Sequence, residues 1–107
     1  MGYGGFGGGN MQQLMKQAQA MQRKLQEAQQ EISETEITGS AAGGIVEVTI
    51  TGDKTPVSVS IKPEAVDPDD VEMLEDMVLA ALNDAVAQAD KLSKDLLGPL
   101  GNAGGLF

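Results

Sequence analysis

The chain has 107 residues, a formal net charge of −9, no cysteine and no histidine. The missing residue types exclude thiolate nucleophiles, imidazole bases and the usual zinc ligands, so we expect no enzyme, no metal site and no cofactor. The sequence has neither a basic-then-apolar leader nor an apolar run of about 20 residues, which together with the lack of cysteine predicts one cytosolic domain.

Glycine-rich segments at 1–10 and 98–107 are predicted to be flexible tails around a single domain at 11–97, because they bury too little to offset the entropy of ordering. Both segments also carry apolar residues, so the alternative is that they fold onto a partner. All the aromatic residues lie in these segments. The folded core is therefore expected to be aliphatic and methionine-based.

Residues 11–33 are predicted to form a long amphipathic helix capped by Asn10. Apolar residues recur there at alternating spacings of three and four, the a/d pattern of a coiled coil. This seam comprises Met11, Leu14, Ala18, Met21, Leu25, Ala28 and Ile32. A helix of about 23 residues spans about 34 Å. That is long for so small a domain, so part of it is expected to project and to pair with another helix.

Three antiparallel strands are predicted next, in the segments 34–39, 44–52 and 56–62. Apolar and polar residues alternate in the second and third segments, as in strands that are covered on one face. The apolar set is Val46, Val48, Ile50, Val57, Val59 and Ile61. Gly43-Gly44 and Gly52-Asp53 provide residues suited to the connecting turns.

A second helix is predicted to begin with Asp67 as its cap and Pro68 in its first turn, and to end at Leu97 before Gly98-Pro99. The stretch 77–87 is apolar almost all round, so a second subunit is expected to cover it. The resulting fold is an α+β homodimer of order α-β-β-β-α with projecting helices. Its predicted interface residues are Met21, Leu25, Val78, Leu82 and Val86.

The cations of the first helix are candidates for phosphate contacts. Lys16 and Arg23 share the face opposite the seam, Lys24 lies to one side, and eight glutamines fill much of the remaining polar surface. The alternative is an ordinary solvated face, because Glu27 lies within ion-pair spacing of Arg23 and Lys24. The residues alone favour this alternative, because such pairs are common on helix surfaces.

Four segments resemble the YbaB/EbfC family of bacterial nucleoid-associated proteins: GNMQQLMKQAQAMQRKLQEAQQEI, GIVEVTITG, DPDDVEMLEDMVLAALNDA and GGLF. The resemblance covers nearly the whole chain. It implies a homodimer whose long helices project like tweezers, and which binds double-stranded DNA with little sequence specificity and affects nucleoid organisation and gene expression.

The same resemblance implies DNA contacts at the helix positions with suitable chemistry, which are Lys16, Arg23, Lys24, Lys91 and Lys94. No membrane partner and no small-molecule substrate are expected. The alternative function is a protein-interaction or scaffold module that uses the projecting helices and the apolar tails.

Overall fold

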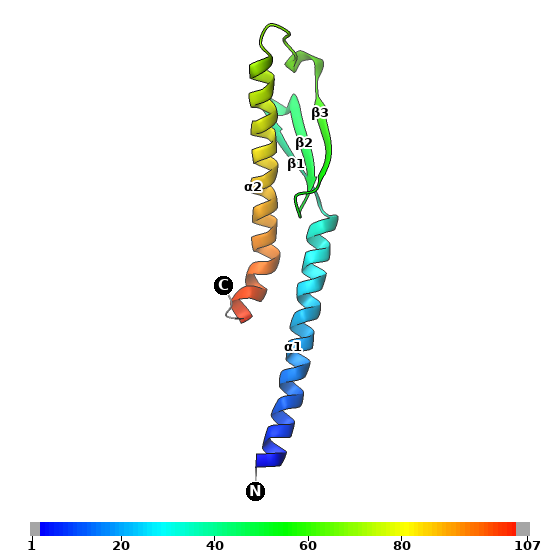
Figure 1. Cartoon of the computed structure of the whole chain (residues 1–107), viewed down its shortest axis with the longest axis vertical. Helices are drawn as coiled ribbons and strands as arrows, with labels where there is room; N and C mark the ends of the chain where they lie inside the picture. Colours follow the sequence, from blue (N-terminus) through cyan, green and yellow to red (C-terminus); the bar gives the residue numbers. More distant parts are fainter. Residues whose placement is uncertain (1–2, 105–107) are drawn as a thin grey trace.

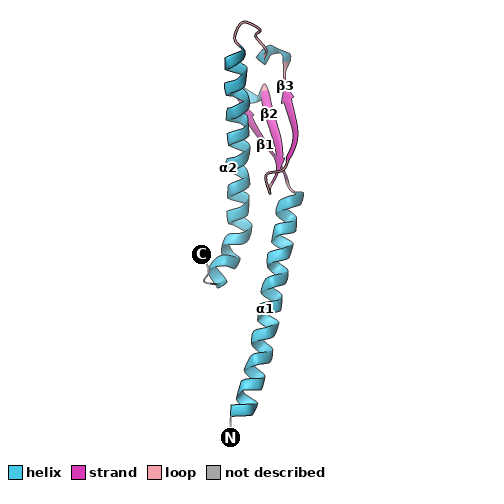
Figure 2. Cartoon of the chain, viewed as in Figure 1, coloured by secondary structure: helices cyan, strands magenta, loops and turns pink. Residues whose placement is uncertain are grey.

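A computed structural model describes residues 3–104, and the surroundings of the side chains from residue 10 to residue 100. Two long helices precede and follow a three-stranded sheet in the chain, as predicted for the α+β class (Figure 2). The elements are α1 (Tyr3–Glu34), β1 (Glu36–Ala41), η1 (Ala42–Gly44), β2 (Val46–Thr51), β3 (Pro56–Ile61), η2 (Pro63–Ala65) and α2 (Val71–Gly104).

Both helices are longer than the sequence predicts. Asn10 lies inside α1 rather than at its start, and Pro99 lies inside α2 rather than after its end. A proline there removes one backbone hydrogen bond without necessarily ending the helix. The helical backbone therefore includes parts of both predicted tails. Their flexibility remains a prediction, and residues 1–2 and 105–107 lie outside the described residues.

The start of α2 differs from the predicted one. The backbone N–H of Met73 donates a hydrogen bond of 3.1 Å to the Asp70 carboxylate, which is the interaction expected of an N-cap. The Asp67 carboxylate instead accepts a 2.9 Å hydrogen bond from the N–H of Asp69 in the preceding turn. The helix therefore begins at Val71 with Asp70 as its cap, and Pro68 belongs to the turn.

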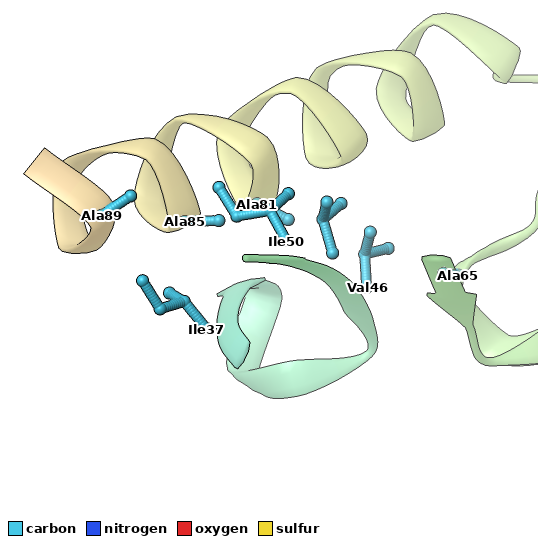
Figure 3. Packing of buried hydrophobic residues seen from close by; sticks show 8 residues of the cluster. Ile37, Val46, Ile50, Ala65, Ala81, Ala85 and Ala89 are labelled. Atoms are coloured by element: carbon cyan, nitrogen blue, oxygen red, sulfur yellow. The ribbon is translucent and has the colours of Figure 1, made fainter. Parts of the chain in front are cut away.

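The sheet is antiparallel, with strand order β1-β2-β3. Helix α2 lies across one face (Figure 1), where Val46, Val48 and Ile50 pack against Ala81 and its neighbours Ala85 and Ala89 (Figure 3). The predicted aliphatic core is confirmed. Methionine contributes less than expected, because Met77 only borders the core and none of the buried side chains in residues 10–100 is a methionine.

The chain is strongly elongated, with extents of 84 × 21 × 16 Å and a radius of gyration of 22.1 Å. A compact domain of this length would have a radius of gyration of about 13 Å. The difference arises because α1 continues well beyond the C-terminal end of α2 (Figure 1). Part of α1 therefore projects from the body of the fold, as the sequence predicts.

Candidate nucleic-acid interface

The projecting part of α1 is cationic. Residues 10–26 contain three cations and no acidic residue. Lys16 and Arg23 lie about 10 Å apart along the helix axis, on the face opposite the apolar seam, and Lys24 lies to one side. All three side chains are exposed. The first carboxylate of the chain, that of Glu27, follows this cationic stretch directly.

These cations are not engaged in ion pairs. Among the side chains of residues 10–100, one ion pair lies within 4.0 Å. It joins Lys54 and Asp90, whose Nζ and Oδ1 atoms are 2.6 Å apart. Glu27 forms no such pair with Arg23 or Lys24, although the spacing would allow one. Exposed, unpaired cations are compatible both with an ordinary solvated face and with a phosphate-binding face, so this geometry leaves both alternatives open.

Two further predicted contacts lie on α2. Lys91 and Lys94 are both exposed. They belong to the part of α2 that reaches down toward α1 (Figure 1), and residues 91–104 carry two cations and one acid.

The remaining charge is concentrated elsewhere. Residues 27–90 carry two cations and fifteen acids. Many of these acids gather around the start of α2, at the end of the molecule farthest from the start of α1 (Figure 1). Because charges act across a distance set by the salt concentration, the projecting end presents a more favourable electrostatic surface to an anionic polymer than the opposite end does.

The turn between β2 and β3 is held by local contacts. The hydroxyls of Thr51 and Thr55 donate hydrogen bonds to Asp53, and they lower the pKa of its carboxyl. The turn borders a shallow cleft of about 250 Å³. Its lining residues are Gln29, Ile32, Gly52, Asp53, Lys54, Ser93 and Leu97. Since Lys54 is paired with Asp90, it is a poorer phosphate ligand than the α1 cations.

Strand β3 is uncovered within the chain. Its register places Val59 opposite Val48, and Ile61 opposite Val46, so both belong to the face that α2 covers elsewhere. Helix α2 lies over β1 and β2, however, and leaves Val59 58% exposed. The expectation that one face of every strand is covered is therefore wrong for β3 in the isolated chain.

The two flanks of α2 differ in chemistry. On the β1 side, the Asp84 carboxylate accepts a 3.0 Å hydrogen bond from Ser40 N–H, and the Gln88 amide donates one of 3.1 Å to Thr38 C=O. Elsewhere on α2, Leu79 and Leu82 are 55% and 38% exposed. We call the exposed apolar side chains of β3 and α2 together the β3–α2 patch: Val57, Val59, Ile61, Leu79 and Leu82.

The predicted interface residues have different surroundings. Leu82 lies in the β3–α2 patch, whereas Val78 and Val86 pack partly against the core of their own chain. Met21 is half-buried and Leu25 is exposed on α1. The structure therefore leaves Leu82 exposed on α2 and places the two α1 residues on a different helix.

A sequence model of the YbaB/EbfC DNA-binding family matches residues 7–105. The chain belongs to this family. A nucleoid-associated protein of Acetivibrio thermocellus is 48% identical over 110 residues, which cover 99% of this chain and 96% of that protein. One from Clostridium botulinum is 52% identical over 106 residues, which cover 97% of this chain and 94% of that protein.

A crystal structure of another protein has a fold similar to that of this YbaB/EbfC chain. The crystal structure of an uncharacterized protein, HP0035 from Helicobacter pylori, superposes with a TM-score of 0.70 at 22% identity, and the match covers 83% of this chain and 94% of that one. This likeness supports the fold. Neither helix, over the described residues, has a stretch that is both long and apolar enough to cross a membrane.

Two features of this YbaB/EbfC chain were not predicted from its sequence. The acid-free run up to residue 26 is readable directly, because the first acidic residue is Glu27. The exposure of β3 is not readable, because Val57, Val59 and Ile61 alternate with polar residues as a covered strand would. Only the position of α2 over the sheet shows whether such a strand is covered or exposed.

Proposed function

We propose that this protein is a homodimer that binds duplex DNA with little sequence specificity through the projecting ends of its helices. Such binding would place it on the nucleoid and contribute to nucleoid organisation and gene expression. The observation that carries the proposal is the projecting end of α1, where Lys16, Arg23 and Lys24 are exposed and unpaired in a stretch without acids. Membership of a DNA-binding family supports DNA as the ligand of that surface.

The chemistry of this surface favours phosphates over bases. Lysine and arginine side chains spread along one helix can neutralise successive phosphates, and the glutamine amides can donate further hydrogen bonds to the backbone. Contacts of this kind fix the protein on the duplex and do not read its sequence. Weak sequence preference follows from the kind of contact.

Dimerisation is supported by the β3–α2 patch. Val59 and Leu82 leave large apolar surface in water, and exposed apolar patches of this kind mark interaction sites. A second copy brings the same patch, as a two-fold interface requires. Asp84 and Gln88 bind two backbone groups of β1, the Ser40 N–H and the Thr38 C=O, so β3 offers the more open sheet edge to a partner.

The proposal is tested by fluorescence anisotropy with several unrelated duplexes of equal length at about 50 mM salt, where phosphate contacts are strong. The expected result is binding to every duplex with similar affinity. If the dimer binds no duplex at this salt concentration, the DNA proposal is wrong, and the alternative of a protein-interaction module is favoured.

A further inference from the structure

The N-terminal half of the α1 seam is uncovered. Met11 and Leu14 of the seam are 63% and 62% exposed, and Met15 beside it is 59% exposed, whereas Ile32 at the other end of the seam is buried. This part of α1 lies beyond the end of α2 (Figure 1). We call the four side chains Met11, Leu14, Met15 and Ala18 the tip strip. An apolar strip on the most cationic helix of the molecule has no role in binding phosphate.

The covered half of the seam indicates what fits the uncovered half. Near Ala28 and Ile32, the seam lies beside α2 of the same chain, so a helix already packs there. The same spacing of three and four continues without a break to Met11. The partner that fits the tip strip is therefore a helix with a matching seam, and α1 of a second copy carries one.

The size and charge of the tip strip limit when such pairing can occur. A stable interface involves about 20–30 residues a side, and the tip strip has four. Each projecting end also carries three cations and no acid, so two ends repel each other in solution. Bound DNA offsets both the repulsion and the small contact area. Its phosphates neutralise the cations, and the duplex holds the copies close together.

The geometry of paired tips has a functional consequence. Lys16 and Arg23 lie on the face opposite the seam, so two helices that meet through their tip strips point these cations outward on both sides. We propose that the α1 tips of two dimers pair through their tip strips on DNA and thereby bridge two duplexes, one on each outer face. This inference rests on the proposed function, because the same cations must contact DNA.

Bridging is tested by capturing a fluorescent duplex on beads that carry a second duplex, with the protein as the only link. The Met11→Gln/Leu14→Gln variant keeps every charge and a good helix-forming residue at both positions. The expected result is unchanged affinity for a single duplex and a loss of capture of about tenfold or more, as expected when multivalent linkage is removed. Met73→Gln, an equally conservative change of an exposed methionine near the start of α2, should capture as wild type does.

The outcomes separate the two proposals. If wild type binds single duplexes but captures none, bridging is wrong and the proposed function stands. If the double variant captures duplexes as well as wild type, the tip strip is not the contact. If the double variant loses both capture and affinity for a single duplex, the tip strip contacts DNA itself, and the pairing of tip strips is wrong. If wild type binds no duplex, the proposed function has failed.

A cysteine cross-link identifies the partner of the strip directly. The chain has no cysteine, so Leu14→Cys introduces a single thiol on the tip strip, and Gln12→Cys introduces one on the opposite face. We expect disulfide-linked chains with Leu14→Cys only when DNA is present, and none with Gln12→Cys. Cross-linking of dilute Leu14→Cys without DNA would show that the strip pairs inside one dimer, which overturns the inference, as would the absence of cross-links with DNA.

Discussion

Gly39 of β1 lies directly against the backbone of α2 at Ala85. A Cβ atom at residue 39 would collide with the carbonyl oxygen of Ala81 and the backbone nitrogen of Ala85. Ala81, Ala85 and Ala89 are fully buried at this contact. The helix can lie this close to the sheet because one side of the contact has no side chain and the other has only methyl groups.

Replacing Gly39 with alanine should therefore destabilise the fold. The added methyl group has no space without a shift of α2, and such overpacking costs about 1–3 kcal/mol or more. Urea denaturation followed by circular dichroism measures the change. Gly98→Ala is the control, because a Cβ there meets no atom within 4 Å and its position in α2 favours alanine. An unchanged urea midpoint for Gly39→Ala would refute this packing.

The β3–α2 patch should hold the dimer together. Val59→Asp places a charge on a side chain that is exposed in the single chain, so the chain should stay folded while its association is lost. Sedimentation at micromolar concentration should show a folded monomer for Val59→Asp, and a monomer or an unfolded chain for Leu82→Asp. A wild-type protein that sediments as a monomer would contradict the proposed dimer, and a dimeric Val59→Asp variant would move the interface elsewhere.

The two candidate caps of α2 can be told apart by substitution. Asp70→Ala removes the acceptor of the Met73 N–H and should cost about 1 kcal/mol of stability, a typical value for an N-cap. Asp67→Ala should cost less, since its partner lies in the preceding turn. Thermal unfolding of both variants provides the comparison. A larger loss for Asp67→Ala would restore Asp67 as the cap.

The terminal segments should contribute little to folding. Deleting residues 1–9 and 101–107 removes glycine-rich sequence that can bury little surface, so the melting temperature should change by only about 2 °C. A scanning calorimeter measures it. A much larger fall would indicate that Tyr3, Phe6 or Phe107 packs against the folded part.

Much of the fold could be predicted from periodicity. The seam from Met11 to Ile32 and the alternation from Val46 to Ile50 each correspond to an element of the right type. The cap of α2 was misplaced because Asp67 and Asp70 are both good caps, and only the hydrogen bond from Met73 decides between them. The contact of Gly39 with α2 joins residues distant in the sequence, so no local pattern could reveal it.

The candidate site was predicted only in part. The positions of Lys16 and Arg23 on one helix face follow from their spacing. Their freedom from ion pairs does not, because the spacing of Arg23 and Glu27 allows a pair that does not form. The separation between a cationic projecting end and an acidic opposite end depends on how the helices extend, which the sequence did not define.

The central claim is that the projecting end of α1 binds DNA through Lys16, Arg23 and Lys24. The most direct test is the salt dependence of DNA binding for wild type and for the Lys16→Ala/Arg23→Ala/Lys24→Ala variant, with Lys54→Ala as the control cation. Each phosphate contact contributes about −0.9 to the slope of log K against log salt, so losing six cations per dimer should make the slope shallower by about five. Lys54→Ala should leave both affinity and slope nearly unchanged. A triple variant that binds with the affinity and slope of wild type would contradict the account.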